Sequence, residues 1–259
     1  MLRRAYEPLN AHLQPNKVLV IYGPRRVGKT THLTQFLKST PLKYKLDSGE
    51  NFRTPQILGS QDFSQILADI GGCELVAIDA AQSIPNIGMG LKIIVDQEPG
   101  IQVVATGSSS FELAAQTGEP LTGRKRTRTL YPMAPSELLA VFNRMELREK
   151  LPEFLIFGLY PEVLQAPTRS AKIEAITEIA NSCLLKDVLS FDRIKSSRTL
   201  LDLFKLLAFQ VGSQVSFNEM ASATRSSPNS THQNSAMTWA SFGRIWSLWN
   251  GSSTAVTIH

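Results

Sequence analysis

One short segment near the amino terminus constrains the fold more than any other part of the 259-residue chain. Residues 23–30 read GPRRVGKT, directly after the apolar run VLVIY at residues 18–22. That run is short, β-branched and apolar on both faces, which is typical of a strand covered by helices on both sides. A strand, a glycine-rich turn and a helix in this order predict a phosphate-binding loop in a parallel α/β sheet.

The residue types of this loop suit a phosphate group for separate physical reasons. Glycine lets the backbone wrap closely round the anion, and successive N–H groups and the amino end of the next helix point toward it. Lys29 supplies a positive charge for the β- and γ-phosphates, and the hydroxyl of Thr30 is suited to hold Mg²⁺. We therefore predict nucleotide binding by a continuous run of residues: Gly23, Pro24, Arg25, Arg26, Val27, Gly28, Lys29, Thr30 and Thr31.

Two more buried strands are predicted at residues 75–78 and 103–105, and polar residues follow each of them. Asp79 follows the first, where a carboxylate at the carboxyl end of a parallel strand can bind the water shell of Mg²⁺. The alternative role for Asp79 is a helix or turn cap. Thr106 and Ser108 follow the second strand, within reach of a γ-phosphate. Helical stretches are expected between the strands, at residues 31–37, 63–70 and 91–95.

Outside this core the chain is predicted to be mostly helical. At the amino terminus Leu2, Tyr6, Leu9 and Leu13 recur at helical spacing and predict a short amphipathic helix. Beyond Tyr131 the strand pattern fades, and GLYPEVL at residues 158–164 is interpreted as a turn between helices. Helices are expected at residues 136–142, 153–157, 173–188 and 200–211.

Charge is distributed unevenly along the chain. The net charge of +5 is mild, so general polyanion binding is not implied, and the clearest basic cluster is local, at residues 124–128. From Ser226 to His259 there is a single charged residue, Arg244, together with all three tryptophans. No apolar run approaches the ~20 residues that cross a bilayer, and no secretory signal is present. We expect a cytoplasmic protein without a membrane partner.

Four segments in order carry a resemblance to a known group: GPRRVGKTT, IDAAQSIPNIG, ATGSSSF and LTGR. Over about residues 1–225 the chain resembles prokaryotic AAA-type P-loop ATP-binding proteins, in which an ATPase core precedes a helical part, a winged helix and a domain of unknown function. The resemblance implies a five-stranded parallel sheet with AAA-type strand order, and ATP and Mg²⁺ as cofactors. By position it assigns phosphate binding to Lys29, metal binding to Thr30 and Asp79, and γ-phosphate sensing to Thr106 or Ser108.

Arg124, in the LTGR segment, falls where the group has an arginine that stabilises transferred charge, including charge in a neighbouring subunit. The alternative is that Arg124 is one solvated member of a basic stretch. The resemblance therefore makes a second copy of the chain a candidate partner, beside an unidentified protein.

One departure from the group concerns hydrolysis. The relatives read IDEAQ in the second motif, whereas this chain has Ala80 in place of the glutamate. That glutamate would orient or deprotonate the attacking water, and a methyl group can do neither. Gln82 and Glu74 are the residues considered as substitutes. We predict ATP binding with weakened hydrolysis; the alternatives are a non-catalytic ATP-dependent regulatory module and, third, a DNA-binding regulator.

The expected domains follow from the resemblance and the composition. They are an AAA-type core at residues 1–135, a helical lid-like region at 136–211, the start of a winged helix at 212–225 and an aberrant, poorly ordered tail at 226–259. Nucleic acid is not an expected partner of such a truncated form, because the recognition helix is missing.

Two hypotheses account for the tail. In one, its apolar residues at helical spacing form a short amphipathic helix that packs on the body or on a partner. In the other, the tail is translated out of frame, because a shifted frame from Ala236 permits DDLGKLWAHLVAVERVKY, which is similar to the relatives' final domain. The DNA sequence decides between them.

Overall fold

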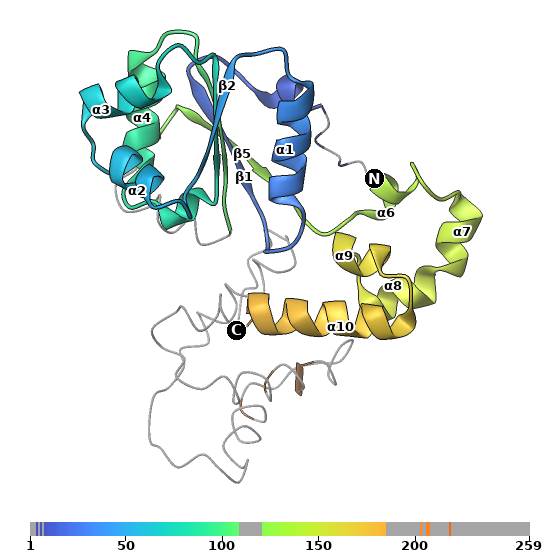
Figure 1. Cartoon of the computed structure of the whole chain (residues 1–259). Helices are drawn as coiled ribbons and strands as arrows, with labels where there is room; N and C mark the ends of the chain where they lie inside the picture. Colours follow the sequence, from blue (N-terminus) through green and yellow to red (C-terminus); the bar gives the residue numbers. More distant parts are fainter. Residues whose placement is uncertain are drawn as a thin grey trace, which may run out of the picture. The chain divides into compact units, whose positions relative to one another are not determined.

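The computed structural model describes Arg4, Tyr6, residues 8–108, residues 121–184 and four single residues near the carboxyl terminus, Leu203, Leu206, Leu207 and Asn218. The chain divides into two compact units, Met1–Ile179 and Ala180–His259. The sheet, the 3-10 helices and the α-helices described below belong to the first unit (Figure 1). The expected tail and, apart from Asn218, the expected winged-helix start lie outside the described residues.

The first unit contains one sheet of parallel strands. In chain order they are β1 Lys17–Tyr22, β2 Tyr44–Ser48, β3 Leu75–Asp79, β4 Gln102–Thr106 and β5 Lys125–Thr129. The spatial order is β2-β3-β4-β1-β5, with every neighbouring pair parallel. The expected α/β fold with a five-stranded parallel sheet, followed by a helical part, is confirmed.

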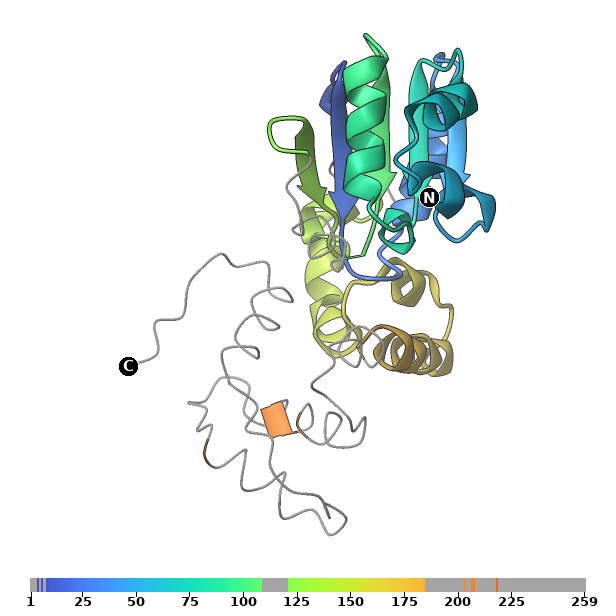
Figure 2. The same cartoon turned by 90° about the vertical axis from the view of Figure 1, so that its left-hand side faces the viewer.

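Helices cover both faces of the sheet, which explains why the central strands are apolar on both sides. Val18, Val20 and Tyr22 of β1 pack in one core cluster, whereas Leu19 and Ile21 pack in the other. The first cluster is completed by α2 Arg53–Leu58, α3 Phe63–Ile70 and α4 Ile87–Gln97, and the second by α1 Lys29–Ser39. Figures 1 and 2 show α1 and α4 on opposite sides of the sheet.

The two edge strands are the ones that residue patterns alone did not predict. In β2, Tyr44 and Leu46 are exposed, and β5 reads KRTRT, so neither strand has a continuous apolar run. An edge strand has one neighbour and less helical cover, so its composition approaches that of a loop. Their existence was implied only by the family resemblance.

The predicted helix at the amino terminus is not found among the described residues there, so this prediction is wrong for them. Pro8 is extended, with φ −81° and ψ 141°, and only a short 3-10 helix, η1 Leu9–His12, follows it. Proline has no N–H to donate and its ring clashes with the preceding turn, so it ends a helical pattern. Leu9 and Leu13 are nevertheless buried, against the α1 face of the sheet.

Short helices follow the sheet: α6 Pro135–Leu138, α7 Arg144–Glu149, α8 Leu151–Phe157, α9 Pro161–Gln165 and α10 Arg169–Ile179. The helix expected at 136–142 is shorter than predicted, and the turn expected at 158–164 passes into α9. The helix expected at 173–188 starts earlier, at Arg169, and gives way to a π-helical turn at Ala180–Leu184. Residues 185–188, and most of 200–211, lie outside the described part of the chain.

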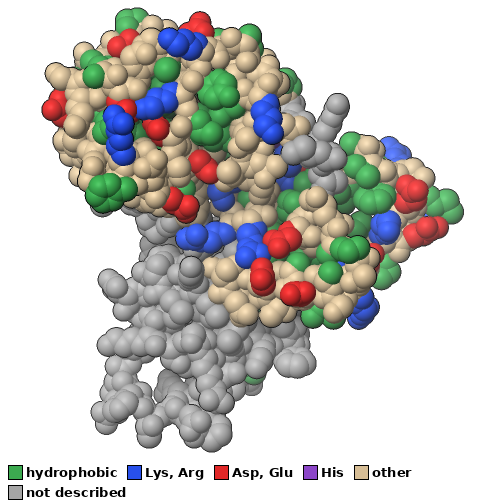
Figure 3. All heavy atoms as spheres, in the orientation of Figure 1, with side chains coloured by type: hydrophobic (Ala, Val, Ile, Leu, Met, Phe, Trp, Pro, Cys, Tyr) green, Lys and Arg blue, Asp and Glu red, His purple; other side chains and the backbone are tan. Residues whose placement is uncertain are grey.

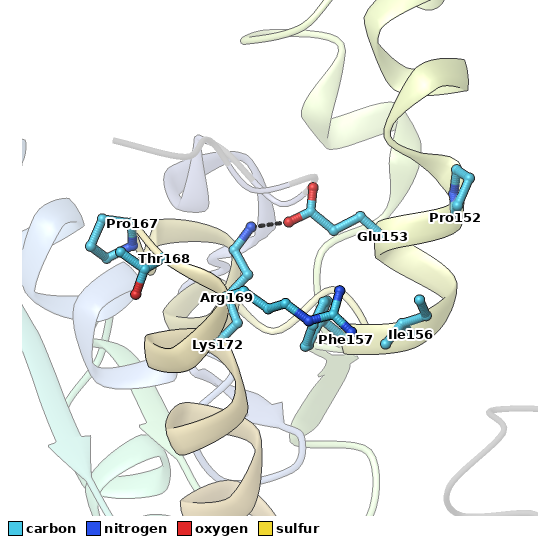
Figure 4. Close-up of a pocket in the computed structure, with 8 residues that line it drawn as sticks. All are labelled: Pro152, Glu153, Ile156, Phe157, Pro167, Thr168, Arg169 and Lys172. Carbon is cyan, nitrogen blue, oxygen red and sulfur yellow. Dashed lines mark hydrogen bonds and ion pairs between the residues drawn. The ribbon is translucent and has the colours of Figure 1, made fainter.

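Helices α8 and α10 hold each other through two charged contacts around a cavity of about 380 Å³ (Figure 4). Lys172 of α10 donates to Glu153 of α8, and the Arg169 guanidinium lies 5.4 Å from the centre of the Phe157 ring. The Lys172 hydrogen bond lowers the pKa of Glu153, so this carboxylate is ionised at neutral pH. Lys172 and Arg169 both already have partners, so we interpret this cavity as part of the packing of α8 against α10.

A close backbone contact between α2 and α4 gives a test of the core packing. A Cβ at Gly90 would lie 2.3 Å from the carbonyl oxygen of Leu58, so an alanine there must push the two helices apart. We expect Gly90→Ala to lower the free energy of unfolding by about 1–3 kcal/mol in urea denaturation, despite the better helix propensity of alanine.

Gly71→Ala is the matched control, since its Cβ would meet no heavy atom closer than 3.4 Å. This variant should unfold within about 0.5 kcal/mol of wild type. Equal stability of the Gly90 and Gly71 variants would contradict the helix packing described above.

Candidate functional site

The carboxyl ends of β1, β3 and β4 meet at one edge of the sheet, because the strands are parallel neighbours. The predicted phosphate loop lies there, between β1 and α1. Its backbone requires glycine at two points. At Gly23 a Cβ would lie 2.0 Å from the carbonyl oxygen of Leu130, and Gly28 has φ +92° at the start of α1. Arg26 also has a positive φ, of 61°, so the loop is tightly folded.

Lys29 is held inside this loop. Its Nζ donates to the carbonyl oxygen of Gly23 at 2.8 Å and to that of Pro24 at 2.7 Å. The ammonium group is therefore placed over the loop by groups that a phosphate oxygen can replace, with a gain in charge attraction. Val27 is fully buried and anchors the loop in the core on the α1 face.

Asp79 brings together three segments at this edge. Its Oδ2 accepts a hydrogen bond from Thr30 Oγ1 at 2.8 Å, and its Oδ1 accepts one from Thr106 Oγ1. Thr106 is fully buried at the end of β4. The sequence-predicted metal residues and one of the two predicted sensors are therefore direct neighbours.

This set of oxygen atoms fits a magnesium ion held mainly by other ligands. A threonine hydroxyl and a carboxylate are hard donors of the kind that Mg²⁺ prefers, and protein sites for this ion commonly supply only one or two carboxylates. Within the described ranges there is no cluster of three or more His, Cys, Asp or Glu side chains able to hold a metal. Phosphate oxygens and water would have to complete the coordination.

Ser108, the other predicted sensor, is joined to the second motif. Its backbone N–H donates to Oε1 of Gln82 at 3.1 Å, and its side chain is almost fully buried. Gln82 thus links the loop after β3 to the end of β4. The side-chain oxygen of Gln82 therefore already accepts a structural hydrogen bond.

Ala80 follows Asp79 directly, in the left-handed conformation with φ 51° and ψ 40°. The loop after β2 contacts the backbone at this point, because the Gly49 N–H donates to the Asp79 carbonyl oxygen at 2.8 Å. A Cβ at Gly49 would lie 2.3 Å from the Ala80 carbonyl oxygen. Gly49 was not found from the sequence; the only available signal was a glycine just after an unrecognised strand.

The structure does not bring Glu74 or Arg124 to this edge. Glu74 precedes β3 and accepts from the backbone N–H of Lys43 at 2.8 Å, at the opposite end of the strand from Asp79. Glu74 therefore cannot replace the missing glutamate. Arg124 precedes β5, where its carbonyl oxygen accepts from Val18 N–H, and its guanidinium donates to Asp96 of α4. Any contact of Arg124 with nucleotide would have to be made in another copy of the chain.

A cavity of about 620 Å³ opens beside the phosphate loop, between the start of α1 and helices α9 and α10. Arg26 spans it and donates to Glu162 of α9 and to Glu178 of α10. Figure 3 shows basic and acidic side chains side by side below the sheet, over the loop and α10. Sequence reasoning missed both glutamates, because no pattern pairs residues so far apart in the chain.

Within the described residues, no helix has the length and apolar character needed to span a membrane.

Comparison with known proteins agrees with the fold of the sheet-bearing part of the chain. Residues 15–139 match the family model described as an AAA domain, and residues 148–239 match a domain of unknown function. An uncharacterized protein of Methanocaldococcus jannaschii is 26% identical over 226 residues, covering 81% of this chain and 50% of that protein. This chain therefore spans about half the length of the curated relative that it matches. Residues 15–139 are thus similar to an AAA domain, and residues 148–239 to a domain of unknown function.

Proposed function

We propose that this chain binds ATP with Mg²⁺ at the carboxyl edge of its sheet and hydrolyses it slowly, if at all. The observation that carries the proposal is the contact of Asp79 with both Thr30 and Thr106, beside a loop that already holds Lys29 over its carbonyl groups. Three separate segments converge on one small volume that suits a metal-bound polyphosphate.

In this proposal each residue has a defined role. Backbone N–H groups of the loop at residues 25–31 donate to the phosphates, and Lys29 exchanges its two carbonyl partners for phosphate oxygens. Thr30 and Asp79 hold Mg²⁺, which neutralises phosphate charge when bound. Thr106 fixes the Asp79 carboxylate, and Ser108 lies next to it as the second γ-phosphate sensor. In this proposal the binding core lies within residues 1–135, and the lid-like helical region begins at residue 136.

Weak hydrolysis follows from what surrounds the position of the attacking water. Ala80 offers only a methyl group, Glu74 lies at the far end of β3, and the Gln82 carbonyl oxygen is occupied by Ser108 N–H. General-base catalysis typically contributes 10²–10⁴-fold to a rate, and neither Glu74 nor Gln82 is placed to provide it.

A non-catalytic regulatory module is the second candidate, favoured by one specific observation. Arg26 ties the phosphate loop directly to α9 and α10, so occupation of the loop can change the position of these helices without any turnover. For Arg124 to contact nucleotide bound to a second copy of the chain, the two copies would have to assemble. Such a contact would serve ATP hydrolysis and is not part of the regulatory alternative.

Lys29→Ala tests nucleotide binding. Loss of the ammonium charge should weaken ATP·Mg²⁺ binding at least about tenfold in isothermal titration calorimetry, because Lys29 is held over the carbonyl groups of the loop. Lys38→Ala, in the last turn of the same helix, removes the same charge away from the loop and should leave binding within about twofold. Equal affinities of the two variants would contradict the assigned site.

Ala80→Glu tests the explanation for weak turnover. The restored carboxylate should raise phosphate release from ATP about 10²-fold or more above wild type, measured by a coupled phosphate assay. Ala80→Gln has the same length without a basic carboxylate and should stay near wild type. An ordinary ATPase rate in the wild-type protein, abolished by Lys29→Ala, would overturn the proposal of weakened hydrolysis while leaving ATP binding intact.

A further inference from the structure

Arg26 joins the phosphate loop to both α9 and α10. Its Nη1 lies 3.1 Å from Glu162 Oε2 and 2.8 Å from Glu178 Oε2. The two glutamates come from different helices, so a single guanidinium holds both helices to the loop. The bond to Glu178 and then that to Glu162 raise the pKa of Arg26, so its charge is permanent.

The cavity at this point carries more negative than positive charge. Glu162, Glu174 and Glu178 line it, with Arg26 as the single basic residue among its described lining groups. A polyphosphate entering the loop would therefore meet carboxylates on the helical side, and the nearest cation there is already shared by two of them.

We propose that Arg26 is a nucleotide-operated latch: bound phosphate draws its guanidinium away from Glu162 and Glu178, which releases α9 and α10 from the loop. This inference rests on the proposed function, because it requires phosphate in the loop. It adds Glu162 and Glu178 as positioning residues, which set where Arg26 points but do not contact the nucleotide.

The physical basis is competition for one cation. The Arg26 ion pairs are part-exposed, with side-chain exposures of 34% for Arg26, 46% for Glu162 and 58% for Glu178. Such pairs are weak, so a polyphosphate with several negative charges and bidentate geometry can displace them. The two ion pairs therefore oppose nucleotide binding, and Glu162 and Glu178 lower the affinity of the loop for ATP·Mg²⁺.

Glu174 provides a matched control on the same helix. It lies one turn before Glu178 and lines the same cavity, but Arg26 donates to Glu178 and Glu162 and makes no described bond to Glu174. Glu174→Gln and Glu178→Gln therefore remove the same charge from nearly the same place, and only the second acts through Arg26.

The first test measures ATP·Mg²⁺ affinity by calorimetry for the full chain. Glu162→Gln/Glu178→Gln together should tighten binding about tenfold, and Glu174→Gln should change it less than about twofold. In an Arg26→Gln background the same pair of substitutions should gain less than about twofold, because no shared cation is left. Equal effects of Glu178→Gln and Glu174→Gln, or an undiminished gain without Arg26, would overturn the latch.

The second test measures amide hydrogen exchange of α9 and α10. Without nucleotide, exchange there should be faster in Glu162→Gln/Glu178→Gln than in wild type or Glu174→Gln. On addition of ATP·Mg²⁺, wild-type exchange should rise to the level of the double variant. If ATP binds but slows exchange in these helices, the latch is wrong and the proposed function stands. If neither wild type nor any variant binds ATP, the proposed function and the latch both fail.

Discussion

The carboxylate of Asp79 is the interaction on which the rest of this site depends. Through one group the end of β3 is joined to the start of α1, at Thr30, and to the end of β4, at Thr106. Because β3, β4 and β1 are parallel neighbours, their carboxyl ends meet at this point and nowhere else in the unit. The buried, two-sided sheet is what brings the loop, the carboxylate and the threonine within hydrogen-bonding distance.

The surrounding backbone is built to keep this edge closely packed. Gly23 allows the strand to approach Leu130, and Gly49 allows the loop after β2 to lie against Ala80. Neither position has room for a Cβ, so each glycine is required by a neighbouring carbonyl group. The position of Asp79 is thus set by two loops as well as by its own strand, which supports its role as a fixed ligand in the proposed site.

The sequence allowed the central part of this architecture to be predicted, and the reason is burial. Strands β1, β3 and β4 have helices on both faces, so their apolar runs are unbroken, and the polar residue after each run is at the functional edge. The exposed edge strands β2 and β5 lack that pattern. At the amino terminus the apolar spacing does not give the predicted helix over the described residues, because Pro8 is extended and interrupts the pattern.

Contacts between distant segments lay beyond sequence patterns. Arg26 was expected among phosphate-binding residues, but its partners Glu162 and Glu178 follow from how α9 and α10 pack near the loop. In the same way, Glu74 and Arg124 were candidates for roles at the site, but each precedes its strand. Both therefore lie at the amino ends of the strands, away from the loop. Which end of a strand a residue occupies decides its access to the loop.

Binding of Mn²⁺ in the presence of ATP, followed by electron paramagnetic resonance, tests the central claim most directly. The account predicts an ATP-dependent bound Mn²⁺ signal in wild type. Asp79→Asn should abolish this signal, and Asp62→Asn, at the amino end of α3, should preserve it. A signal of equal strength in the Asp79 and Asp62 variants would show that the metal is held elsewhere and would contradict the proposed site.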